Sequence, residues 1–145
     1  MSGAPARTYE HLPSTTQPPP TAEELTVTAD PATTVRRYDD AWAEHDDDAR
    51  LAILRAIWAE EGIYTDPEIP SGVRGPHALS AFIAKTFLEF PGLVVTATAE
   101  LTVIGDRAWY SWVAKTHNGE TFAGMDFVEF ASDGRIARLT NFYEV

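Results

Sequence analysis

Hydrophobic and polar positions alternate most clearly in the stretch ETFAGMDFVEFA, residues 120–131. Side chains of a β-strand point alternately to its two faces, so this alternation predicts a strand. One face carries a single aspartate among apolar and glycine positions: Phe122, Gly124, Asp126, Val128 and Phe130. A carboxylate on an apolar face is costly unless it is paired, hydrogen-bonded or protonated, and such groups often mark functional sites. Asp126 is therefore a candidate functional residue. The alternative is that the opposite face forms the core and Asp126 faces water.

The first half of the chain has helical periodicity instead. Asp30-Pro31 supplies an N-cap acceptor and a proline at the first helical position, so a helix is predicted from there to about Glu44. Its buried face is expected to hold Val35, Tyr38 and Trp42, and its solvent side Arg36, Arg37, Asp39 and Asp40. A second helix, which an aspartate of the Asp46–Asp48 run can cap, carries the apolar residues from Leu51 to Trp58 and is predicted to end near Gly62. A third begins at Pro76 and stops at Pro91-Gly92.

Strand signals dominate the rest. A short strand is predicted at Ile63–Asp66, followed by a loop over Glu68–Gly75. Four long strands follow at Leu93–Ile104, Ala108–His117, Glu120–Ala131 and Arg135–Tyr143. Asn118-Gly119 and Asp133-Gly134 favour type I′ hairpin turns between them. The predicted fold is α+β, with three N-terminal helices packed on one face of a curved antiparallel sheet.

The chain of 145 residues has the length of one domain. Residues 1–29 contain five prolines and no periodicity before Leu25, so we interpret them as a disordered or loosely packed arm. The alternative is an arm that packs on a partner subunit. Residues 30–145 are predicted to form the single folded domain.

Composition limits the function classes. Hydrophobic residues make up 44% of the chain, there is no cysteine, and the net charge is -11. The charge argues against a nucleic-acid partner and against anionic membrane surfaces. There is no apolar run long enough to span a bilayer and no secretory signal pattern, so a cytoplasmic protein is expected. The four histidines are scattered without the spacing of a metal site, so no metal and no cofactor are expected.

Two further residues are candidates beside Asp126. Tyr38 lies on the buried stripe of the first helix, where its hydroxyl needs a partner; plain core packing is the alternative. Asp66 ends the first strand in the sequence YTDP, where an ordinary turn residue is the alternative.

Taken together, these segments resemble ketosteroid isomerase and the SnoaL-like polyketide cyclases of the nuclear transport factor 2-like superfamily. The resemblance covers about Thr33–Val145 and is carried by RRYDDAWAEHD, GIYTDP and GMDFVEF. It implies a cone-shaped sheet around three helices, also described as a cystatin-like α+β barrel. It also implies that Asp66 is the general base, and that Tyr38 and Asp126 donate hydrogen bonds to an oxyanion. Ketosteroid isomerase is the known example of a carboxylic acid kept neutral for that purpose.

The expected activity is that of an isomerase or cyclase using acid–base chemistry on a hydrophobic carbonyl substrate, such as a polyketide or steroid-like compound. Asp66, beside a proline loop open to water, is expected to be ionised, and Asp126 to have a raised pKa because it is buried. Residues expected to contact the substrate are Trp42, Tyr64, Phe82, Trp112, Phe122 and Asn141. Two alternatives remain: an epoxide hydrolase or ether-ring-forming cyclase, in which an arginine such as Arg74 would position water, and a non-catalytic binding protein.

A homodimer is also expected. The curved sheet has only one face covered by its own helices, so either Trp109 or the pair Tyr110 and Trp112 must point outward, and exposed aromatic patches mark interfaces. The resemblance likewise implies a dimer formed through the sheet.

Overall fold

A computed structural model describes residues 30–98 and 100–144 of the protein. The expected arm, residues 1–29, lies outside the described residues. Ten elements follow in the order α2 (Pro31–Ala41), α3 (Asp47–Ile57), β1 (Trp58–Asp66), β2 (Ile69–Arg74), α4 (Pro76–Glu89), β3 (Val94–Ala97), β4 (Thr102–Ile104), β5 (Arg107–Lys115), β6 (Thr121–Phe130) and β7 (Ile136–Tyr143). Among the described residues, no helix is both long and apolar enough to cross a membrane.

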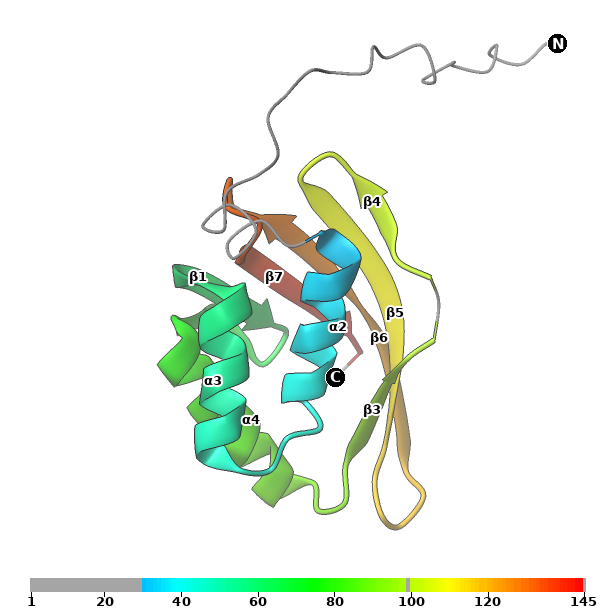
Figure 1. Ribbon diagram of the computed structural model, residues 1–145. Helices are drawn as coiled ribbons and strands as arrows, with labels where there is room; N and C mark the ends of the chain where they lie inside the picture. The colour runs from blue at the N-terminus through cyan, green and yellow to red at the C-terminus, as the bar shows by residue number, and fades with distance from the viewer. Residues whose placement is uncertain (1–29, 99, 145) are drawn as a thin grey trace, which may run out of the picture.

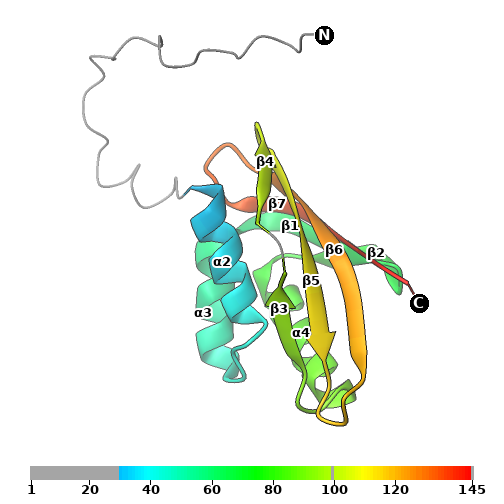
Figure 2. The same ribbon diagram turned by 90° about the vertical axis from the view of Figure 1, so that its right-hand side faces the viewer.

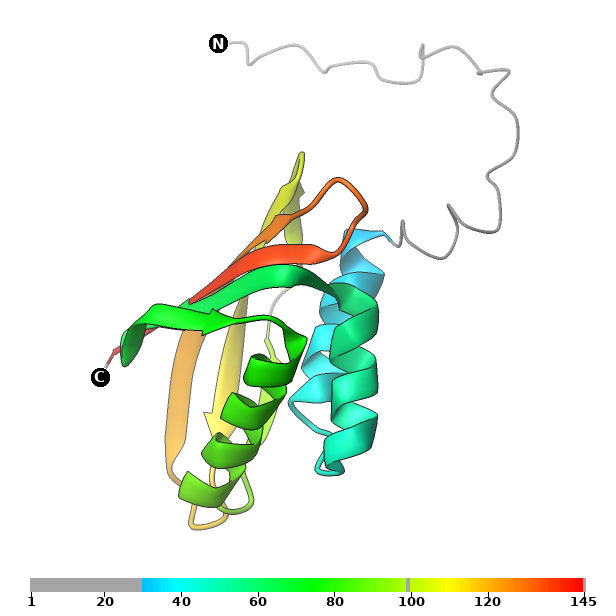
Figure 3. The same cartoon turned by 90° about the vertical axis from the view of Figure 1, so that its left-hand side faces the viewer.

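The strands form one curved sheet in the order β2-β1-β7-β6-β5-β3, with β4 also paired to β5. The three helices gather on one face of this sheet (Figure 1). The expected α+β fold with a cone-like sheet is confirmed. The sheet differs from the expectation in two ways. It is mixed, because β1 runs parallel to β7 while the other pairs are antiparallel. It is also open, since β2 and β3 end the strand order without pairing to each other. Figure 3 shows β1 and β7 side by side, with β2 at the edge.

Helix starts follow the capping chemistry of the sequence. The side chain of Asp30 accepts a hydrogen bond from the backbone N–H of Thr33 at 2.9 Å, and Asp46 accepts one from Ala49 at 2.8 Å. The aspartate run therefore caps α3, as expected. The buried residues of α2 are Thr34, Val35, Tyr38 and Ala41. This stripe turns Tyr38 toward the sheet.

Three boundaries differ from the expectation. The second helix ends at Ile57, and residues 58–62 belong to β1, because Trp58 pairs with Ile136 of β7 and sheet pairing overrides the apolar helical run. The expected loop over 68–75 is largely strand β2, which pairs with β1 as an edge strand, a position that tolerates Pro70. The expected strand over 93–104 is two short strands, β3 and β4, which pair with different parts of β5.

Two turns also differ. A type I′ turn needs positive φ at both central residues, but at Asn118-Gly119 only the glycine has one, at 89°. No non-glycine residue in the described part of the chain has positive φ, so the 133–134 turn is not of type I′ either. The hairpins still form, because a glycine in the left-handed region supplies the reversal.

The two faces of the sheet differ in character. Register pairs Asp126 with Tyr110 of β5 and with Asn141 of β7, so these three side chains share the inner, helix-covered face. Trp109 and Phe127 pair on the opposite face. Figure 2 shows α2 and α3 on one side of β5 and β6, with no helix of the described residues on the other. The expectation that an aromatic residue points outward is met by Trp109, which is 41% exposed, and Tyr110 and Trp112 point inward.

Candidate active site

Asp126 lies in the middle of β6, on the inner face of the sheet. Its side chain is buried, with 6% of the residue exposed. This confirms that the face carrying Asp126 is the core face. The carboxyl therefore sits among apolar and aromatic side chains, where water cannot solvate its charge well.

Burial raises the pKa of Asp126 to about 7. The negative charge of Asp39 adds to the rise, while the polar groups of Tyr110 and Trp112 oppose it. The expected direction of the shift is confirmed. A carboxyl with a pKa near neutrality can both accept and donate a proton at physiological pH, which is what acid–base catalysis requires.

Tyr38 faces this carboxyl from α2. Its ring stacks on Trp58 with centroids 5.8 Å apart, and its hydroxyl oxygen accepts a hydrogen bond from the indole N–H of Trp42 at 2.8 Å. Burial, with the nearby charge of Asp126, holds the pKa of Tyr38 well above its usual value. The hydroxyl therefore stays protonated. Its oxygen accepts the hydrogen bond from Trp42, so its own proton remains available for donation to a substrate oxygen.

Asp66 has a different environment. One carboxylate oxygen accepts a hydrogen bond from the Tyr64 hydroxyl at 2.9 Å, and the other accepts from the backbone N–H groups of Glu68 and Ile69 at 2.8 and 3.0 Å. The expectation that water reaches Asp66 is wrong, since only 7% of the residue is exposed. The reason is that the chain turns back into strand β2 after Pro67, which places the backbone N–H groups of Glu68 and Ile69 against the carboxylate.

A chain of hydrogen bonds leads from Asp66 toward Asp126. Tyr64 accepts at its hydroxyl from the side-chain amide of Asn141 at 3.0 Å, and the carbonyl oxygen of that amide accepts from the Trp112 indole at 2.9 Å. Asn141 lies directly across the ladder from Asp126. The chain of hydrogen bonds ends at the Trp112 indole, a group that lowers the pKa of Asp126, and no hydrogen bond of normal geometry reaches Asp126 among the described residues.

Most residues expected to contact a substrate lie near this chain. Phe82 of α4 packs on Tyr64 with ring centroids 5.1 Å apart and on Trp42 at 6.4 Å. Phe122 does not join them. It is 39% exposed and packs on Phe90 at the far end of β6, with ring centroids 5.7 Å apart.

Sequence reasoning missed two members of the cluster, Asp39 and Tyr110. Asp39 was expected on the solvent side of the first helix, but it is half-buried, and burial together with the charge of Asp40 raises its pKa to about 6. It follows Tyr38 and lies four residues after Val35, so its place at the edge of the buried stripe was available from helical spacing. Tyr110 could have been found from the strand register opposite Asp126.

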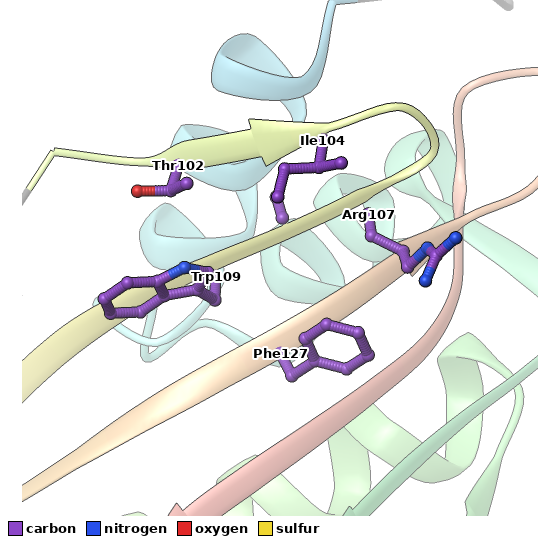
Figure 4. A pocket seen from close by; sticks show the side chains of 6 residues that line it. Thr102, Ile104, Arg107, Trp109 and Phe127 are labelled. Atoms are coloured by element: carbon purple, nitrogen blue, oxygen red, sulfur yellow. The ribbon is translucent and has the colours of Figure 1, made fainter. Parts of the chain in front are cut away.

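Two hollows on the surface lie away from the Asp126–Tyr38 pair. One, of about 110 Å³, is on the outer face of the sheet beside Trp109 and Phe127 (Figure 4). The other is open, about 740 Å³, and bordered by Thr121–Met125 and Phe142–Glu144. The second hollow borders Gly124 and Tyr143, which are both neighbours of Trp112. Gly124 is the ladder partner of Trp112, and the ring of Tyr143 packs on that of Trp112 with centroids 6.1 Å apart. It is the hollow that comes nearer to the hydrogen-bond chain.

Three helices over the inner face of a curved, open sheet are the nuclear transport factor 2-like fold, which a solved structure of that name shares. Residues 35–139 match the sequence model of the SnoaL-like domain. Because this match covers most of the chain, the protein belongs to the SnoaL-like domain family.

Solved structures agree with this assignment. A candidate isomerase of the SnoaL-like family from Agrobacterium tumefaciens is 26% identical with a TM-score of 0.72, over 79% of this chain and 97% of that one. A candidate ketosteroid isomerase from Kribbella flavida is 24% identical with a TM-score of 0.63, over 83% and 82% of the two chains. A nuclear transport factor 2-like protein of unknown function from Exiguobacterium is 22% identical with a TM-score of 0.62, over 77% and 98%. No curated protein matches the chain.

Proposed function

We propose that the protein is a cofactor-independent isomerase or cyclase that acts on a hydrophobic carbonyl compound, such as a polyketide or steroid-like molecule. The observation that carries the proposal is the pair formed by Asp126, a buried carboxyl with a pKa of about 7, and Tyr38, a buried hydroxyl with its proton free. The similarity to a candidate SnoaL-like isomerase supports the same reaction class.

The chemistry of the pair is enolisation. Ionised Asp126 removes a proton from the carbon next to the carbonyl, the C–H electron pair moves into the enolate, and the Tyr38 hydroxyl donates a hydrogen bond to the oxygen that becomes negative. Return of the proton from Asp126 to another carbon completes an isomerisation. Attack of the enolate on a second carbonyl of the same molecule forms the carbon–carbon bond of the ring, and the proton held by Asp126 passes to the resulting alkoxide to complete a cyclisation.

The contacts favour a division of roles that differs from the one implied by the family resemblance. Three donors already occupy the carboxylate of Asp66, so both of its oxygens are engaged before a substrate binds. We therefore assign proton transfer to Asp126. Asp66 is assigned to holding Tyr64, and through it Asn141 and Trp112, in position.

Single substitutions separate the two assignments. Asp126→Asn should lower turnover on the order of a hundredfold to ten-thousandfold, the usual share of a general base. Asp66→Asn should lower it less, because it loosens positioning only. Exchange of the α-protons of α-tetralone and related hydrophobic ketones in D₂O, followed by NMR, is the assay. A larger loss in Asp66→Asn would return the role of base to Asp66.

One alternative function has a supporting observation. Asp126, Asp66 and the hydroxyls of Tyr38 and Tyr64 are all buried, which also suits a binding protein whose interior is not catalytic. Such a protein would show a raised melting temperature with 2-naphthol or hydrophobic ketones but no deuterium exchange. The epoxide hydrolase alternative lacks this support, because Arg74 is exposed and contacts Glu61 at 3.3–3.4 Å.

A further inference from the structure

The hydroxyl of Tyr110, on the inner face of the sheet, lies between two carboxyls. It is buried and has no hydrogen-bond partner of normal geometry among the described residues. Buried hydroxyls are nearly always hydrogen-bonded, so an unpartnered one suggests a group whose partner changes. Its neighbours are the carboxyls of Asp126, directly across the ladder, and of Asp39 on α2.

Asp39 reaches this position because of its place on the helix. It lies next to Tyr38 at the edge of the buried stripe, and it is half-buried, whereas the adjacent Asp40 is exposed and lies 3.9 Å from the guanidinium of Arg37. The titratable groups that face Asp126 are Tyr38 and Asp39 from α2, Tyr64 from β1 and Tyr110 from β5. None of these four carries a positive charge, so within the described part of the chain they place no cation between Asp39 and Asp126.

We propose that Asp39 is a positioning residue that acts through the Tyr110 hydroxyl to set the pH at which Asp126 exchanges its proton. The inference deepens the proposed function and rests on it where it concerns turnover. Asp39 is not assigned contact with the substrate.

The mechanism follows from the hydroxyl having a single proton. When Asp39 is ionised it competes for the Tyr110 hydrogen bond, and its charge disfavours a second charge on Asp126. When Asp39 is neutral, the hydroxyl is free to donate to an ionised Asp126. Ionisation of either carboxyl therefore opposes ionisation of the other, and the two titrate as a coupled pair.

The test uses substitutions that are expected to move the titration midpoint of Asp126 in opposite directions. Asp39→Asn removes the charge and should lower the titration midpoint of Asp126 by on the order of half a pH unit to one pH unit. Tyr110→Phe removes a donor and should raise it. Asp40→Asn is the matched control, since it removes the same charge one residue away on the same helix. The charge of Asp40 acts on Asp39 and not directly on Asp126, so this variant should move the midpoint of Asp126 far less than Asp39→Asn does. The readout is the carboxyl ¹³C chemical shift of Asp126 against pH in the full-length protein.

Equal midpoints in Asp39→Asn and Asp40→Asn, or a fall in Tyr110→Phe, would overturn the inference. Asp39→Ser serves as a second variant if Asp39→Asn does not fold. Because the titration needs no substrate, its outcome is separate from that of the proposed function. Altered midpoints together with no loss of α-proton exchange in Asp126→Asn would retain the coupled pair and refute the catalytic role. If exchange does depend on Asp126, the acid limb of its pH profile should move down in Asp39→Asn by the same amount.

Discussion

At the scale of single residues, the chemistry centres on one carboxyl that the sequence itself singled out. Asp126 was recognisable because it interrupts an apolar strand face, and the structure confirms that it is buried with a raised pKa. Its neighbours were harder to predict. Helical spacing places Asp39 at the edge of the buried stripe but does not show that Tyr110 and Asp126 lie opposite it, and two of the three donors around Asp66 come from a turn whose path depends on β2. Sequence patterns show where burying a carboxyl would cost free energy better than they show which neighbouring groups offset that cost.

The raised pKa of Asp126 predicts how stability depends on pH. In the folded protein the carboxyl binds its proton up to about pH 7, whereas in the unfolded chain it releases it near 3.8. The unfolded state thus binds fewer protons between these values, and the free energy of unfolding falls as pH rises from about 4 to about 7. A tenfold change in proton affinity corresponds to about 1.4 kcal/mol, so the total effect on the free energy of unfolding is at most about 4 kcal/mol.

Asp126→Asn should remove this dependence. The free energy of unfolding of the variant, minus that of the unmodified protein, should be larger at pH 8 than at pH 5. Urea unfolding at both pH values measures this gain. Comparing the two pH values cancels any pH-independent cost of a buried amide. Met125→Leu, which changes the neighbouring outer-face position without altering charge, should show no such gain. A difference that is constant with pH would mean that Asp126 is solvated.

At the scale of elements, helices were easier to predict than sheet edges. The capping aspartates and helix-initiating prolines act locally, so the starts of α2 and α4 could be located within the sequence. The boundary at Trp58 and strand β2 depend on pairing with segments distant in the chain, and nothing local distinguishes an edge strand containing Pro70 from a loop. The parallel pairing of β1 with β7 is likewise a property of the assembled sheet.

A close approach within the sheet gives a prediction at this scale. A Cβ added at Gly124 of β6 would lie 2.4 Å from the Trp112 ring and 2.4 Å from the carbonyl oxygen of Phe142. Neither can move freely, since the Trp112 indole is held by Asn141 and the carbonyl belongs to β7. Gly124→Ala should therefore destabilise the fold by about 1–3 kcal/mol, the usual cost of overpacking.

Thermal unfolding is the measurement for Gly124→Ala, with Ala123→Ser as the control on the exposed outer face of the same strand. The control should change the melting temperature little. The fluorescence of Trp112 reports whether the loss of stability is accompanied by displacement of its indole ring. A neutral Gly124→Ala variant would show that Trp112 can move away from Asn141, and the hydrogen-bond chain would then not be rigid.

At the scale of the whole molecule, the outer face of the sheet has no cover of its own among the described residues. Three of its large apolar residues are exposed: Ile104 (70%), Trp109 (41%) and Phe142 (53%). Figure 4 shows Trp109 and Phe127 beside the shallow hollow on this face. An apolar patch of this kind on a protein with a net charge of -11 needs a covering partner, because charge alone does not remove the cost of exposing it.

We propose that the partner is a second copy of the chain, packed through this face. A stable dimer buries about 800 Å² on each subunit, and an antiparallel face with aromatic residues at its centre suits a two-fold interface, in which the same patch meets itself.

Light scattering at micromolar concentration should give about twice the subunit mass of 16.0 kDa. Trp109→Glu and Phe142→Glu should each place a charge in the interface and yield monomers with an intact fold by circular dichroism. Leu88→Glu is the control, because Leu88 is 82% exposed but lies on α4, away from this face. A mass near 16 kDa for the unmodified protein, or dissociation caused equally by the control, would show that the outer face is not the interface.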